Sequence, residues 1–148
     1  MAKIKNEEVL SVLRAVLALG RRLRSERPVG GITLSGVSVL GTLSRTGPIV
    51  SNQLAEAERL EPQSLTRLLA ELEEQGLISR ARGEQDRREM RVALTESGRT
   101  LLTDDLRSRR AWLEKAMAGA LNGRERQLLL AAAAAMSKLA QYEADDEG

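Results

Sequence analysis

The stretch PQSLTRLLAELEEQGLISRARGEQDRREMRVALTESG, residues 62–98, decides the fold of this chain. Leucines in its first third recur at intervals of three and four residues, which predicts a helix with one buried stripe. Two short segments that suit β-strands follow, LISRA (77–81) and MRVAL (90–94), joined by a loop rich in arginine. They predict a β-hairpin with a basic tip. A polar helix followed by such a hairpin is the layout of a winged helix-turn-helix that binds DNA.

Three more helices are expected before this stretch. Residues 4–25 carry apolar side chains at helical spacing, which predicts an amphipathic helix that ERPVGG (26–31) ends. Thr33 can cap a second helix, which ends at the TGP of residues 46–48. Ser51 is expected to cap a short third helix, SNQLAEAERL, and Pro62 suits the first turn of the fourth.

Two further helices are expected after it. Thr95 should cap a long helix that runs to about Ala120, and Asn122 with Glu125 predicts a capping box for the last helix. The acidic end EADDEG (143–148) is expected to be a solvated tail. With 148 residues the chain is expected to be one domain. Its fold class is mainly α with a small β-hairpin wing.

Composition excludes several functions. The chain has no cysteine and no histidine, so disulfides, Cys/His zinc sites and histidine general-base catalysis are impossible. No glycine-rich nucleotide loop or paired carboxylate site is evident, so we expect no enzyme, no cofactor and no metal site. No apolar run approaches the length of a membrane span, and the N-terminus has acidic residues where a signal peptide would be apolar. We therefore expect a cytoplasmic protein.

The charge is unevenly distributed, although the net charge is only +2. Residues 1–30 carry seven Lys and Arg against three acids, and residues 79–95 carry five Arg against three acids. Residues 51–78 instead carry six Glu against two Arg. The basic charge is thus concentrated in the N-terminal segment and the hairpin, where it favours contact with nucleic acid.

The predicted helix over residues 62–74 presents polar side chains opposite its leucine stripe. Gln63 can pair with adenine, and Arg67 can bind guanine or phosphate. Ser64 and Thr66 lie beside them near the helix start, the part that contacts base edges in this class of motif. The polar face of any surface helix has a similar composition, so this helix alone does not decide the function.

The hairpin and the third helix supply further candidates. Arginines fall close together along the hairpin and suit the narrow minor groove, whose negative potential attracts them. The candidates there are Arg80, Arg82, Arg87 and Arg88. Asp86 is expected to orient an arginine or the loop backbone. Ser51, Asn52 and Gln53 begin the third helix and are candidates for phosphate contacts.

Residues 33–98 resemble the MarR family of bacterial transcription regulators. Asp86 and Arg88, followed by Leu94-Thr95 and Gly98, match that family's wing signature D-x-R-x-x-x-x-x-L-T-x-x-G. Its helix-turn-helix consensus is matched by Leu54-Ala55, Thr66-Arg67, Leu72, Gly76-Leu77-Ile78 and Arg80.

Two positions depart from the family pattern. Arg59 stands in the turn between the third and fourth helices, where a glycine is frequent. Glu61 stands where Ser or Thr frequently caps the fourth helix; a carboxylate can still cap there, and it favours the positive end of the helix.

The resemblance implies a single MarR-type domain over residues 1–148, with a winged helix-turn-helix lobe at 33–98 and dimerisation helices at 1–30 and 99–148. It implies a homodimer bound to double-stranded DNA at a near-palindromic operator, with half-sites about 10 bp apart. It assigns the minor-groove contact to Arg88. It also implies repression relieved by a small-molecule effector, in which case Trp112 either lines the effector pocket or packs at the dimer interface.

An alternative comes from a different class of function. The acidic balance of residues 51–78, together with Glu61, is compatible with a winged-helix protein-interaction module that has lost DNA binding. Binding to a palindromic fragment that survives competitor DNA would separate the two hypotheses.

Overall fold

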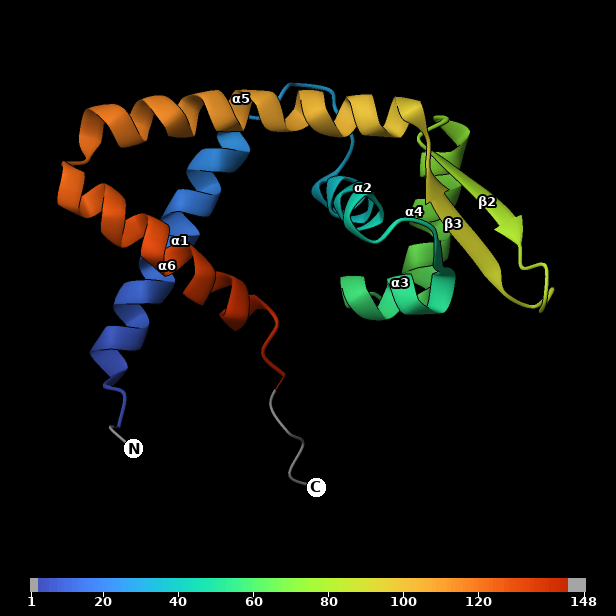
Figure 1. Ribbon diagram of the computed structural model, residues 1–148, viewed down its shortest axis with the longest axis horizontal. Helices are drawn as coiled ribbons and strands as arrows, with labels where there is room; N and C mark the ends of the chain where they lie inside the picture. The colour runs from blue at the N-terminus through green and yellow to red at the C-terminus, as the bar shows by residue number, and fades with distance from the viewer. Residues whose placement is uncertain (1–2, 144–148) are drawn as a thin grey trace. The chain divides into compact units, whose positions relative to one another are not determined.

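The computed structural model describes residues 3–143 and is mainly helical, with one small sheet (Figure 1). The mainly α fold with a hairpin wing is confirmed. Along the chain the elements are α1 (Asn6–Ser25), α2 (Leu34–Thr46), β1 (Ile49–Val50), α3 (Ser51–Glu58), α4 (Pro62–Glu74), β2 (Ile78–Arg82), β3 (Met90–Leu94), α5 (Glu96–Ala120) and α6 (Gly123–Ala140). Apart from Glu143, the segment expected to be a solvated tail lies outside the described residues.

The chain forms two compact units, one ending at Arg109 and the other beginning at Arg110. The division falls inside α5, which continues as one helix from the first unit into the second. The first unit holds α1 and all elements of the winged helix-turn-helix. The second holds the rest of α5 and α6. The expected division of the chain into a winged helix-turn-helix lobe and dimerisation helices, with limits at residues 30 and 99, stays a prediction.

The sheet has three antiparallel strands in the order β1-β3-β2, so β3 is central. The hairpin pairs Ile78 with Leu94 and Arg82 with Met90 at its two ends. Strand β1 was not predicted from the sequence. It has only two residues, and it is defined by the pairing of Ile49 with Val92 rather than by a pattern of its own.

The core of the first unit lies where α2, α3, α4 and the sheet meet. Its most deeply buried side chains are aliphatic, as a chain with so few aromatics requires. They are Val39, Leu40, Leu43, Leu54, Leu72 and Val92. Thr33 caps α2 as predicted, since its side-chain oxygen accepts a hydrogen bond from the Gly36 N–H at 3.1 Å.

The Thr95 to Gly98 segment joins the end of α4 to the start of α5. The Thr95 hydroxyl donates to the Gly76 carbonyl at 2.6 Å and accepts from the Gly98 N–H at 3.0 Å. A Cβ atom at Gly98 would collide with the Leu77 carbonyl oxygen, so only glycine fits. Part of the wing signature is therefore a structural joint.

Helices α1 and α6 each leave most of their large apolar side chains exposed. All residues of both helices are described, and none of them is buried. The predicted capping box of α6 is confirmed, with Asn122 and Glu125 exchanging hydrogen bonds of 2.9 Å. Among the described residues, no helix has the length and apolar character needed to cross a membrane.

Candidate nucleic-acid interface

Helix α4 separates its two faces as the leucine spacing predicts. Leu65, Leu69 and Leu72 are buried against the core. The four candidate side chains at its start are exposed, namely Gln63, Ser64, Thr66 and Arg67. The Thr66 hydroxyl donates to the Pro62 carbonyl at 2.8 Å, so it is left mainly as an acceptor for an outside donor. The start of α4 thus offers one cation and several neutral polar groups.

Glu61 occupies the N-cap position of α4, but its side chain makes no cap hydrogen bond. The carboxylate, which the sequence allows as a cap, is not used as one. The backbone of Glu61 is extended, with φ of −61° and ψ of 141°, and Pro62 begins the helix. Because proline lacks an N–H, the first turn of α4 has one backbone donor fewer without a partner in the helix.

The prediction that Ser51 caps α3 is wrong. Val50 holds the N-cap position, and Ser51 is already the first helical residue. Its hydroxyl donates to the Met90 carbonyl at 3.1 Å and thereby ties the start of α3 to β3. Asn52 and Gln53 follow with exposed side chains. These two side chains are therefore available for a phosphate contact at the start of α3.

Arg59 adopts a left-handed backbone conformation in the turn between α3 and α4, with φ of 53° and ψ of 40°. It is the one non-glycine residue of the described chain with a positive φ. The Leu60 N–H reaches back to the Ala55 carbonyl at 3.0 Å, as in the C-terminal turn that usually contains glycine. This turn therefore has the backbone geometry that glycine usually adopts, although arginine occupies the position.

The wing loop is closed by hydrogen bonds of its own. Gly83 and Glu89 are joined by an N–H to carbonyl bond of 2.9 Å, and the Asp86 carboxylate accepts from the Arg88 N–H at 2.9 Å. A Cβ atom at Gly83 would lie 2.6 Å from the Asp86 carbonyl oxygen. Arg82 donates to the Arg87 carbonyl at 3.2 Å. The loop backbone is thus held while the Arg87 and Arg88 side chains are exposed.

Arg80 differs from the other arginines of the hairpin because an ion pair holds it. Both of its side-chain hydrogen bonds go to the Glu73 carboxylate in the last turn of α4, at 3.1 and 3.0 Å. The hydrogen bond from Arg80 lowers the pKa of Glu73, and Glu73 in turn raises the pKa of Arg80. Sequence analysis missed this pair, although the two residues lie only seven positions apart.

The candidate DNA-binding residues lie on elements that pack against one another. Helix α3 packs on α4, and α4 packs on β2. In Figure 1 the hairpin begins next to the end of α4, and its loop projects to the lower right, away from the helix. Within residues 3–143, no cluster of acidic side chains is placed to hold a metal ion.

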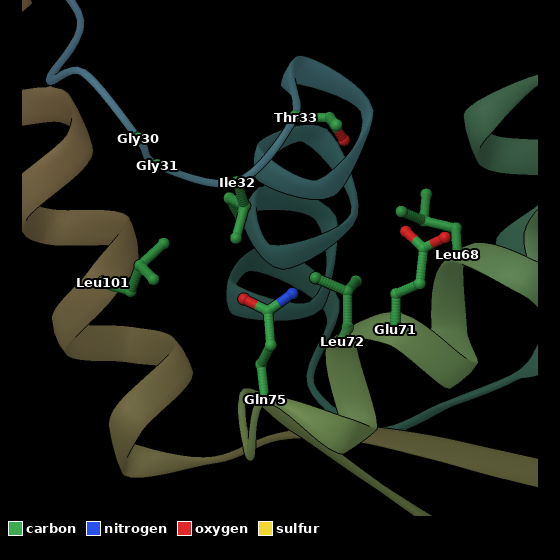
Figure 2. A pocket seen from close by; sticks show the side chains of 9 residues that line it. All are labelled: Gly30, Gly31, Ile32, Thr33, Leu68, Glu71, Leu72, Gln75 and Leu101. Atoms are coloured by element: carbon green, nitrogen blue, oxygen red, sulfur yellow. The ribbon is translucent and has the colours of Figure 1, made fainter.

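A pocket of about 330 Å³ lies in the same unit, behind α4. Its walls come from the segment between α1 and α2, the second half of α4 and Leu101 of α5. Figure 2 shows Ile32, Leu72, Gln75 and Leu101 around this space. Trp112 is not among the lining residues.

A buried ion cluster lies beside the pocket and was also missed. Asp105 of α5, which is 5% exposed, accepts from Arg27 at 2.8 Å and also pairs with Arg109. Arg27 donates to the Ile32 carbonyl at 2.7 Å as well. The spacing of Asp105 and Arg109 could have indicated their pairing. The partner Arg27 lies 78 residues away from Asp105, and no local pattern connects them.

This architecture defines a winged helix-turn-helix transcription regulator. The model of the MarR family matches residues 32–90. The uncharacterized HTH-type transcriptional regulator Mb0904 of Mycobacterium bovis is 38% identical over 125 residues, which are 84% of this chain and 87% of that protein. The chain therefore belongs to the MarR family of transcription regulators and has its DNA-binding helix-turn-helix.

Two other relatives agree with this assignment. The HTH-type transcriptional repressor MdtR of Bacillus subtilis is 31% identical over 117 residues, covering 79% of this chain and 73% of that protein. The crystal structure of a transcriptional regulator protein from Pseudomonas aeruginosa PA01 is 36% identical, with a TM-score of 0.77. That similarity covers 95% of this chain and all of the other. The relatives are regulators rather than enzymes.

Proposed function

We propose that the protein is a homodimeric, sequence-specific repressor that binds a near-palindromic operator in the cytoplasm and releases it when a small molecule binds. One observation carries the proposal. Helix α4, whose exposed start carries Gln63 and Arg67, packs on a hairpin whose closed loop presents Arg87 and Arg88. A helix in the major groove and an arginine in the neighbouring minor groove would use both features.

The apolar face of α1 supports a dimer. Five of its side chains are between 43% and 55% exposed, which leaves a continuous stripe for a partner surface. They are Val9, Val12, Leu13, Val16 and Leu17. In the proposed symmetric homo-oligomer, the second copy would contribute the same helix to the interface.

The oligomeric state tests that part of the proposal. Leu13→Asp places a charge in the stripe and is expected to shift sedimentation from dimer to monomer. Ser11→Asp adds the same charge on the opposite side of α1 and is expected to remain dimeric. A wild-type chain that sediments as a monomer at micromolar concentration would contradict the dimer.

The pocket behind α4 supports a response to a small molecule. Its walls combine the apolar side chains of Ile32, Leu68, Leu72 and Leu101 with polar groups from Glu71 and Gln75, so a ligand with both kinds of surface would suit it. A ligand there would contact α4 directly. The ligand would bind more tightly to one position of α4 than to another. It would thereby change the fraction of molecules in which α4 fits the operator.

Filling the pocket tests the proposed effector site. Small phenolic compounds are the first set to screen, by the rise in melting temperature that they produce in the wild-type protein. Leu101→Trp occupies the volume and is expected to abolish the rise for any compound that binds there. A rise of equal size in Leu101→Trp would place the effector elsewhere.

Selection of bound fragments from random DNA tests the proposed function as a whole. The expected product is a two-fold symmetric consensus with half-sites about 10 bp apart. The repressor role is supported by MdtR, the relative named a transcriptional repressor. Absence of any enriched sequence would instead favour the interaction module, for which the acidic balance of residues 51–78 is the supporting observation.

A further inference from the structure

The ion pair between Glu73 and Arg80 spans the junction between α4, which is the recognition helix of the proposed DNA complex, and the wing. Glu73 lies in the last turn of α4 and Arg80 is the third residue of β2. Arg80 Nε donates to one carboxylate oxygen of Glu73 at 3.1 Å, and Nη2 donates to the other at 3.0 Å. Such a two-point contact fixes direction as well as distance between the two groups.

The state of this pair bears on what Arg80 does in a DNA complex. Its Nε hydrogen and one Nη2 hydrogen already bind Glu73, so a phosphate contact would have to use the other guanidinium hydrogens or break the pair. If the pair broke, an unpaired carboxylate would remain near the DNA backbone, where it repels phosphate. The side chains are 24% and 41% exposed, so water screens the pair and its contribution to overall stability is small.

We propose that Arg80 is a positioning residue rather than a DNA contact, and that its pair with Glu73 sets the angle between α4 and the wing. With this angle held, the start of α4 and the wing arginine Arg88 can occupy adjacent grooves at the same time. The inference rests on the proposed DNA binding for its effect on affinity. The proposed effect of the pair on the angle between α4 and the wing concerns the free protein and does not depend on DNA binding.

Four variants separate positioning from contact when their affinity for the selected operator is measured against salt concentration. Glu73→Gln and Arg80→Gln each break the pair, and Glu73→Arg with Arg80→Glu reverses it. Glu74→Gln removes the neighbouring exposed charge and is the matched control. Thermal melts confirm that all four variants fold.

A positioning role predicts one pattern of affinities. Glu73→Gln and Arg80→Gln both weaken binding by a similar factor, ~3- to 10-fold, without changing the salt slope. The reversed pair recovers most of the loss, and Glu74→Gln does not weaken binding. A DNA contact predicts a different pattern, in which Arg80→Gln lowers the salt slope by about one and Glu73→Gln tightens binding. That second pattern would overturn the proposal.

The effect of the pair on the angle between α4 and the wing is tested on the free protein. Because the chain has no cysteine, Ala70→Cys and Gln85→Cys attach two spin labels to α4 and the wing loop without competing sites. Doubly labelled chains are diluted with unlabelled protein so that only distances within one chain are measured. Glu73→Gln is expected to broaden the distance distribution, and Glu74→Gln is expected to leave it narrow. An unchanged distribution in Glu73→Gln overturns the positioning role, whether or not the protein binds DNA.

Discussion

Thr95 donates its hydroxyl hydrogen to the carbonyl oxygen of Gly76 at 2.6 Å and thereby ties the beginning of α5 to the end of the recognition helix. The same oxygen accepts from the Gly98 N–H and caps α5. One side chain therefore serves two helix ends.

Replacing Thr95 by alanine removes both hydrogen bonds. We expect Thr95→Ala to lower the free energy of unfolding by ~1–2 kcal/mol, because it removes a helix cap and a second hydrogen bond together. Thr100→Ala, at an exposed site inside α5, is the control and should change stability little. Chemical denaturation measures both, and equal midpoints for the two variants would argue against the joint.

Asp105 is expected to matter far more for stability than its neighbour Asp104. Asp105→Asn puts an amide N–H₂ against a guanidinium and leaves Arg27 and Arg109 without their charge partner. We expect it to destabilise the fold by ~3 kcal/mol, as breaking a buried ion pair does. Asp104 pairs with Arg107 on the surface at 3.0 Å, so Asp104→Asn should lose less than ~1 kcal/mol. Similar denaturation midpoints for the two variants would contradict the structural role of the cluster.

The left-handed turn at Arg59 carries a steric cost that glycine would remove. Glycine adopts this conformation without the cost of a Cβ atom, so the free energy of unfolding of Arg59→Gly should exceed that of Arg59→Ala by ~1 kcal/mol. Arg59→Ala removes the same side-chain contacts but keeps the Cβ atom, and it isolates the backbone contribution. If the glycine variant is no more stable than the alanine variant, the turn is not strained.

The wing arginine is expected to contribute a salt-dependent part of DNA affinity. Arg88→Ala should weaken binding to the selected operator and reduce the slope of affinity against salt concentration by about one. Arg99 is an exposed arginine of α5 outside the wing, and Arg99→Ala is the control. Unchanged affinity and slope in Arg88→Ala would remove Arg88 from the interface.

Sequence patterns predicted most of the fold, because each helix carries its own apolar period or cap. Leu65, Leu69 and Leu72 lie on one buried face as their spacing requires, and Thr33 and Asn122 cap the helices they precede. Strand β1 was missed because Ile49 and its neighbour form a strand only through pairing with β3. Two residues are too few to show a period.

The site was predicted less completely than the fold. The sequence indicates which polar residues belong to α4 and the wing, but it does not show what each side chain already binds. Ser51 is tied to Met90, and Arg80 is held by Glu73. Both bonds join different elements, so they depend on tertiary placement. The cluster of Arg27 with Asp105 was unpredictable for the same reason.

The ratio of two dissociation constants tests sequence-specific DNA binding most directly. It compares the wild-type protein on its selected palindrome with the same protein on a scrambled fragment of equal length, at physiological salt. A winged helix-turn-helix that reads bases through α4 predicts at least about a 1,000-fold preference for the palindrome. Equal affinity for the two fragments would contradict sequence-specific recognition.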